Sequence, residues 1–171
     1  MGERRRGHHA IQSVQLVGQR LTAITYGYGG GVSLTGPIIP AGGLAPYLSL
    51  FDASGNFLVS TYYGVTCPSG ANTFNGNCYD VEMDGGLLAP GTYQISITAW
   101  ENLSDAENQG TGTLADGFTG LGNLGTGDRA LDYAFDVVLT SNATAPEPGS
   151  LTSLALAAAL CGASRLLRQR R

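Results

Sequence analysis

A strict alternation of apolar and polar residues is the feature that most constrains this fold. In residues 91–100, Tyr93, Ile95, Ile97 and Ala99 alternate with Thr, Gln and Ser. Successive side chains of a β-strand point to opposite faces, so this pattern predicts a half-buried antiparallel strand. The same reasoning predicts further strands, joined in one case by a hairpin turn at 53–56: 20–28, 47–52, 56–62, 79–84 and 130–140.

Glycine content and low charge support an all-β chain. The 171 residues include 26 glycines, and only 13% are charged, against about a quarter in typical domains. Helical periodicity is almost absent, which excludes a helical bundle. Short strands separated by Gly- and Pro-containing turns predict an antiparallel β-sandwich or jelly roll over residues 20–141.

Charge is partitioned along the chain. Residues 21–145 hold eleven acidic residues against Arg129 alone, while residues 1–20 and 146–171 each carry a net charge of +3, giving −4 in total. An acidic body repels polyanions, and no basic stripe is present. We therefore expect no nucleic-acid partner.

The C-terminus has three successive parts. Pro146-Glu147-Pro148 lies in a segment, 142–150, that we expect to be a linker. An apolar run begins at Leu151 and is followed by the basic residues Arg165, Arg168, Arg170 and Arg171. The apolar run and its cationic end predict a separate hydrophobic helix over 151–171 that is held in a membrane. The alternative is a short buried or amphipathic C-terminal helix.

This three-part tail resembles a PEP-CTERM sorting signal. The resemblance implies a membrane-embedded processing enzyme of the exosortase type as a partner. It also implies export, a transient stay in the inner membrane, and delivery to the cell surface or extracellular polysaccharide matrix. The family carries an N-terminal signal peptide, but residues 1–19 contain no long apolar stretch after Arg4-Arg5-Arg6. We expect these 19 residues to be disordered or to follow from a misassigned start.

A second resemblance concerns the body of the chain. The segment from Tyr47 through Asp52 and Gly55 to Leu58, and the later Leu88-Ala-Pro-Gly91-Thr92-Tyr93, are similar to the bacterial pre-peptidase C-terminal domain class. That class implies a small β-sandwich attached to secreted proteins. It carries little information on activity, because one fold serves many functions.

The sequence offers little catalytic chemistry. Its two histidines are His8 and His9, and there is no Gly-x-Ser-x-Gly elbow or phosphate-binding Gly-Lys-Ser/Thr motif. We therefore expect a protein that is not an enzyme. Two cysteines in the body are too few for tetrahedral zinc. Cys67 and Cys78 are eleven residues apart, which favours a disulfide in an exported protein, with two unpaired thiols as the alternative.

The acidic residues allow two interpretations. Asp80, Glu82 and Asp84 share one face of a predicted strand, and other acids lie at predicted turns. Loop carboxylates are calcium ligands, so Glu101, Asp105 and Asp116 are the candidate residues for a calcium site. The alternative is a solvated acidic surface that keeps the protein soluble. Calcium is the single cofactor that the sequence suggests.

Residues 101–129 form a long connection between two predicted strands. Five apolar side chains in this connection predict a packed excursion rather than free disorder: Leu103, Leu114, Phe118, Leu121 and Leu124. Trp100 opens the connection, and Tyr62 and Tyr63 are candidate neighbours that could stack on sugars or pack at the rim. The leading hypothesis is a non-catalytic exported protein sorted by its tail. The alternatives are a surface glycan-binding module and an accessory domain of a secreted hydrolase.

Overall fold

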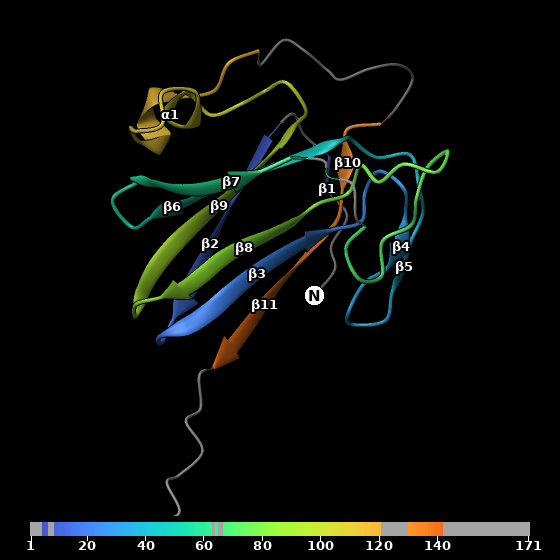
Figure 1. Cartoon of the computed structure of the whole chain (residues 1–171), viewed down its shortest axis with the longest axis horizontal. Helices are drawn as coiled ribbons and strands as arrows, with labels where there is room; N and C mark the ends of the chain where they lie inside the picture. Colours follow the sequence, from blue (N-terminus) through green and yellow to red (C-terminus); the bar gives the residue numbers. More distant parts are fainter. Residues whose placement is uncertain (1–4, 7–8, 63, 65–66, 121–129, 142–171) are drawn as a thin grey trace, which may run out of the picture. The chain divides into compact units, whose positions relative to one another are not determined.

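The computed structural model describes residues 5–6, 9–62, 64, 67–120 and 130–141 (Figure 1). The chain divides into two units, Met1–Ser141 and Asn142–Arg171. The predicted linker 142–150 and the predicted helix 151–171 lie outside the described residues. Within the described part of the chain, none of the helices has the length and apolar character needed to span a bilayer.

Two antiparallel sheets make up most of the first unit. The four-stranded sheet has the order β2-β9-β6-β7, with bounds His9–Leu16, Gly91–Ala99, Pro46–Asp52 and Phe57–Thr61. The three-stranded sheet has the order β11-β3-β8, with bounds Phe135–Ser141, Gln19–Thr25 and Glu82–Leu88. The prediction of an all-β chain is confirmed.

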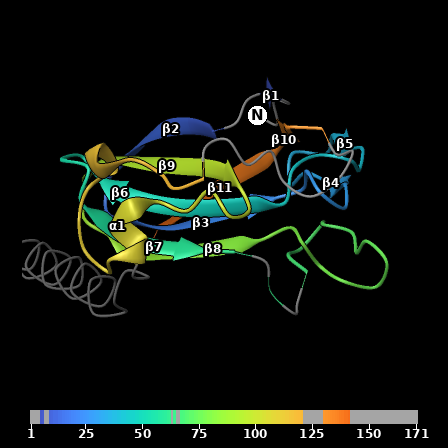
Figure 2. The same cartoon turned by 90° about the horizontal axis from the view of Figure 1, so that it is seen from above.

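Short elements complete the fold. β1 (Arg5–Arg6) pairs with β10 (Asp132–Tyr133), and β4 (Gly31–Val32) pairs with β5 (Ile38–Ile39). One α-helix, α1 (Asp105–Asn108), and one 3₁₀-helix, η1 (Leu114–Asp116), lie in the connection after β9. Figures 1 and 2 show these elements in two perpendicular views.

One hydrophobic core takes residues from both larger sheets. Leu48, Ile95 and Ile97 come from the four-stranded sheet, and Leu21 and Met83 come from the three-stranded sheet. All five are almost fully buried. Burying a side chain of this size stabilises a fold by about 1.5–3 kcal/mol. The face of residues 91–100 that the alternation assigns to the core is therefore the face that lies there.

The prediction that residues 1–19 lie outside the folded domain is wrong for residues 9–16. These residues form β2, which pairs with β9 along its whole length. Leu16 is buried, and Ala10 and Val14 pack against the core. A strand with one buried face needs an apolar residue only at every second position. A search for the continuous apolar run of a signal peptide overlooks such a strand.

Strand ends differ from the predictions where loops interrupt the pairing. β3 ends at Thr25 rather than at residue 28, and the chain then passes through turn residues and through β4 and β5 before it reaches β6. The predicted strand 79–84 begins only at Glu82 and continues to Leu88. The hairpin between β6 and β7 is confirmed, and its turn contains Gly55 at φ +83°, a conformation that glycine adopts without strain.

Candidate functional site

Asp80 lies in the interior and organises the loop after β3. Its side chain is only 1% exposed. One carboxylate oxygen, Oδ1, accepts hydrogen bonds from the Thr25 hydroxyl and from the Tyr28 backbone N–H, each at 3.1 Å. The other oxygen accepts from the Gly29 N–H at 2.7 Å. Burial raises the pKa of Asp80, and these donors oppose the shift. The alternation alone predicts that Asp80, Glu82 and Asp84 share one solvated face of a strand. The structure instead buries Asp80 and leaves Glu82 and Asp84 exposed.

Asp136 anchors a second loop from strand β11. Its carboxylate accepts hydrogen bonds from the Ser33 hydroxyl and from the Leu34 N–H, both at 2.8 Å. These contacts tie the turn between β4 and β5 to the three-stranded sheet. Burial raises the pKa of the nearby Tyr26 phenol above its usual range, and the negative charge of Asp136 acts in the same direction.

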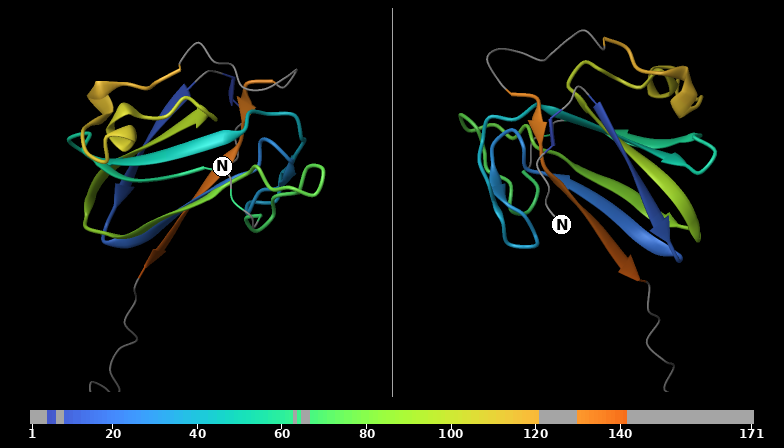
Figure 3. Two further views of the ribbon diagram at one scale, coloured as in Figure 1. Left: turned by 45° about the horizontal axis from the view of Figure 1, so that its top comes forward. Right: turned by 180° about the vertical axis from the view of Figure 1, so that it is seen from behind.

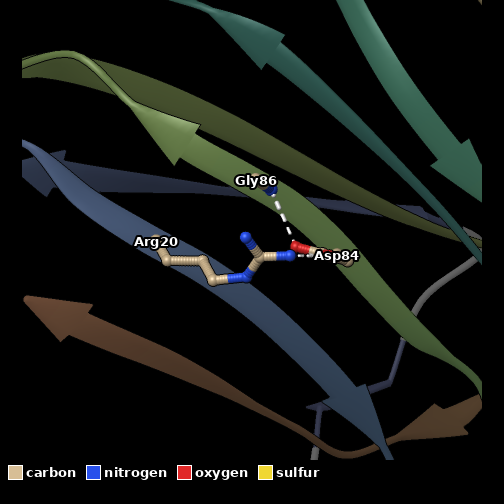
Figure 4. A network of polar contacts seen from close by, with 3 residues as sticks. All are labelled: Arg20, Asp84 and Gly86. Atoms are coloured by element: carbon tan, nitrogen blue, oxygen red, sulfur yellow. Dashed lines mark hydrogen bonds and ion pairs between the residues drawn. The ribbon is translucent and has the colours of Figure 1, made fainter. Parts of the chain in front are cut away.

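Two further aspartates, the half-buried Asp52 and the exposed Asp84, also accept hydrogen bonds that close tight turns. Asp52 accepts hydrogen bonds from the backbone N–H groups of Ser54 and Asn56, at 2.8 and 2.9 Å. Asp84 accepts from the Gly86 N–H at 2.9 Å and forms an ion pair with Arg20 (Figure 4). Hydrogen bonds from Asn56 to Asp52, and from Gly86 to Asp84, hold the pKa of each carboxyl below its usual range.

The three candidate calcium ligands, Glu101, Asp105 and Asp116, lie in the same excursion of the chain but in three different local structures. Asp105 is the first residue of α1, and Asp116 is the last residue of η1. The Asp116 carboxylate accepts a hydrogen bond from the Thr113 N–H at 2.7 Å, and Glu101 is in an exposed turn. Across the part of the chain that the structure describes, no three His, Cys, Asp or Glu side chains form a group that could hold a metal ion. The calcium site at Glu101, Asp105 and Asp116 stays a prediction.

The structure joins Cys67 to Cys78 in a disulfide with Cα atoms 5.1 Å apart, in agreement with the sequence prediction. The loop that it closes packs on the glycine-rich segment after Tyr28. Its backbone contacts include hydrogen bonds from Asn72 N–H to the Gly30 carbonyl at 2.9 Å and from Val32 N–H to the Gly70 carbonyl at 2.8 Å.

Aromatic rings reinforce this closed loop. The ring of Tyr28 lies 4.4 Å from the ring of Tyr79 and meets Phe74 edge-on at 5.6 Å between centroids. Phe74 remains 39% exposed. The disulfide, the ring contacts and Asp80 thus hold one end of the domain together.

The excursion over residues 101–120 packs against the four-stranded sheet, as predicted for this connection. Gly112 accepts a hydrogen bond from the Phe57 N–H at 3.1 Å, and the Leu114 N–H donates to the Gly55 carbonyl at 2.7 Å. Figure 3 shows α1 beside the hairpin of β6 and β7 from two directions. The Thr98 hydroxyl, on the face of β9 opposite the core, donates to the Asn102 carbonyl at 2.7 Å.

Five side chains of the central strands that lie opposite the core have no more than 1% exposure: Tyr47, Ser49, Phe51, Ser96 and Thr98. Thr92 and Gln94, on the same face at the start of β9, are half-buried. Residues 121–129, the remainder of the predicted connection, lie outside the described residues.

Tyr62 and Trp100 form an aromatic pair at one end of the four-stranded sheet. Both β7 and β9 are antiparallel to β6, so they run parallel to each other and end at the same side. Tyr62 follows β7 and Trp100 follows β9, which brings their ring centroids to 5.1 Å with an interplanar angle of 36°. The Tyr62 side chain is 51% exposed, and Trp100 is half-buried. Tyr63, the third predicted member, lies outside the described residues.

The backbone around Trp100 is held in place. The Trp100 N–H donates to the Ala45 carbonyl at 2.7 Å, and the Asn102 N–H donates to the Ala99 carbonyl at 2.9 Å. Glu101, between them, has φ +79°, a left-handed conformation that costs a residue with a Cβ atom about 1 kcal/mol or more. The aromatic pair therefore stands beside a strained, exposed acidic residue.

The proposed sorting residues cannot be placed. Pro146, Glu147, Pro148, Arg165, Arg168, Arg170 and Arg171 lie outside the described residues. The anchoring roles of Asp80 and Asp136 were missed by sequence reasoning. Asp136 sits on the polar side of a clear alternation, and no local signal marks it as the acceptor for Ser33, a residue more than a hundred positions away.

Comparison of the chain with protein-family models, curated proteins and solved structures gives no match.

Proposed function

We propose that this chain is a non-catalytic exported protein, held in the membrane by a C-terminal helix and then sorted to the cell envelope or extracellular matrix by an exosortase-type enzyme. Support comes from the order of elements in the tail. A Pro-Glu-Pro segment at 146–148 precedes an apolar run from Leu151, and arginines follow. An apolar helix with a cationic end stays in the membrane with its basic residues at the interface, which would present residues 146–148 to a membrane enzyme.

The observation that carries the proposal is the disulfide between Cys67 and Cys78. Disulfides persist in oxidising compartments outside the cytoplasm and are rare inside it. A disulfide-closed loop in the body and a sorting tail at its end thus point to the same destination. In this proposal the body is a β-sandwich made of the two larger sheets around their shared core.

The use of the aspartates favours a structural over a catalytic role for the body. Four carboxylates accept hydrogen bonds from backbone N–H groups of turns: those of Asp52, Asp80, Asp84 and Asp136. A carboxylate engaged in this way is poorly placed to act as a general acid or base, because proton transfer would release the turn.

Mass spectrometry of the protein from its native host tests the sorting proposal. We expect extracellular material to lack the peptides that follow Pro148. Replacing residues 146–148 with three alanines should leave the full-length chain in the membrane fraction. Glu82→Ala, which changes an exposed acid of the folded body, should be processed normally. An extracellular protein that still ends in Arg171 would overturn the proposal.

A second candidate function, a glycan-binding module, is favoured by one specific observation, the aromatic pair of Tyr62 and Trp100. The accessory-domain hypothesis has no comparable support.

A further inference from the structure

The aromatic pair of Tyr62 and Trp100 has features that core packing does not explain. Tyr62 lies beyond the last residue of β7, and half of its side chain faces solvent. The ring nevertheless stacks on Trp100, which follows β9, a strand two positions away in the sheet. The pair is therefore produced by the topology of the sheet, with β6 between the two strands, and it presents apolar ring surface at the sheet's end.

Glu101 adds a polar group at the same place. It directly follows Trp100, is exposed, and keeps its left-handed backbone conformation despite the cost of that conformation. Hydrogen bonds of the neighbouring Trp100 and Asn102 N–H groups impose this turn. Strained residues of this kind persist where the surrounding structure holds them, and they concentrate at ligand-binding positions.

The chemistry of this group matches a sugar ring. The face of a pyranose carries C–H groups that pack on aromatic rings, and its hydroxyl groups donate hydrogen bonds to carboxylates. The charge of the body selects between sugars. Residues 21–145 carry a net charge of −10, which repels uronic acids and sulfated glycans.

We propose that Tyr62, Trp100 and Glu101 form a binding site for an uncharged saccharide. The exposed side of the Tyr62 ring contacts the sugar face, Trp100 supports that ring by stacking on it, and the Glu101 carboxylate accepts hydrogen bonds from the sugar's hydroxyl groups. This proposal is independent of how the chain is sorted, because it concerns only the folded body.

The intrinsic fluorescence of the chain reports on this site, because Trp100 is its one tryptophan. The experiment uses the full chain in a polyoxyethylene detergent, because detergents with sugar head groups would compete. Tryptophan fluorescence is followed during titration with cellohexaose, laminarihexaose and, as the acidic comparison, oligogalacturonate. We expect a saturable change in emission with at least one of the two neutral sugars and a weaker change or none with the acidic one.

Variants separate binding from folding. Tyr62→Leu keeps apolar bulk but removes the ring, and it should weaken binding about tenfold, the equivalent of about 1.4 kcal/mol. Glu101→Gln keeps the size of the side chain and removes its charge, and it should weaken binding by a smaller factor. Phe74→Ala is the matched control, because Phe74 is also an exposed aromatic residue but belongs to the disulfide loop, and it should bind as the unmodified chain does. Thermal unfolding of each variant shows whether it is folded.

Each outcome decides the question. If neither neutral oligosaccharide changes the fluorescence at millimolar concentration, the pair is rim packing and the proposal is wrong. It is equally wrong if the folded Tyr62→Leu chain binds as tightly as the unmodified one, or if Phe74→Ala abolishes binding. Tight binding of oligogalacturonate alone would contradict the assigned charge preference and the role of Glu101.

Discussion

Replacing Asp80 with alanine should lower the free energy of unfolding more than the same replacement of any exposed acidic residue in the domain. The substitution removes the acceptor of two backbone N–H groups, those of Tyr28 and Gly29. The Thr25 hydroxyl can turn to the Val81 carbonyl, 3.4 Å away, so it keeps a partner. A buried donor without an acceptor costs about 1–3 kcal/mol. Two such donors amount to about 2–6 kcal/mol, and relief of the buried charge lowers the expected loss to about 2–4 kcal/mol.

Urea unfolding of the Asp80→Ala chain, followed by fluorescence or circular dichroism, measures this loss. Glu82→Ala is the matched control, because Glu82 lies two residues further along and is exposed. Its free energy of unfolding should change by less than about 0.5 kcal/mol. If Asp80→Ala were equally mild, the carboxylate would not hold the loop, and the account of Asp80 as an anchor would fail.

The pH dependence of the same variant gives an independent check. Burial raises the pKa of Asp80 in the folded state above its unfolded value. The folded state therefore holds a proton that the unfolded state releases, and the contribution of Asp80 to stability falls as pH rises between the two pKa values. The difference in stability between the unmodified chain and Asp80→Ala should accordingly be larger in acid than at neutral pH. A difference that grows with pH would show that the N–H donors outweigh burial.

Three other perturbations follow from the structure. Reduction of the Cys67–Cys78 disulfide should lower the free energy of unfolding by about 2–3 kcal/mol, measured by urea unfolding with and without a phosphine reductant; an unchanged midpoint would exclude the bridge. Gly29→Ala places a Cβ atom against the carbonyl of the disulfide loop and should cost about 1–3 kcal/mol, whereas Gly64→Ala, with open space around it, should be nearly neutral in the same assay. The pKa of Asp52 is lower in the folded than in the unfolded state, so its carboxylate stabilises the fold at pH values above the unfolded-state pKa, and this stabilisation is lost as pH falls through the folded-state pKa. Asp52→Asn should therefore destabilise the fold at neutral pH but not in strong acid. An equal loss of stability at both pH values would contradict this.

The sequence predicts the strands well where apolar and polar residues alternate. Residues 91–99 and 135–141 alternate over several residues, and both form long strands. The strand at 9–16 has the same alternation, with Gln12 at one inward position. A search for the continuous apolar run of a leader segment does not detect this alternation. The strand is therefore present in the alternation, and it is overlooked because residues 1–19 are tested only for a signal peptide.

The site depends on contacts that local sequence does not encode. Asp80, Glu82 and Asp84 are acidic residues at every second position, but only Asp80 lies before the strand begins, where the loop that contains Tyr28 and Gly29 donates hydrogen bonds to it. The neighbourhood of Trp100 and Tyr62 could be guessed from their places at the ends of predicted strands. Their stacking required knowledge that β6 lies between β7 and β9, a pairing between residues far apart in the chain.

The turn anchors described here have a consequence for how sequence change in this protein should be judged. The five carboxylates shown above to accept a backbone N–H are all aspartates: Asp52, Asp80, Asp84, Asp116 and Asp136. Aspartate reaches nearby N–H groups because it has one methylene, and glutamate, with one more, carries its carboxylate past them. Substitution scores treat Asp→Glu as a mild exchange, since charge is kept. At Asp52, Asp84 and Asp116, whose N–H donors lie two to four residues away in the chain, that exchange is a severe one, and a homologue or designed variant that keeps net charge by swapping the two acids there would lose these turns.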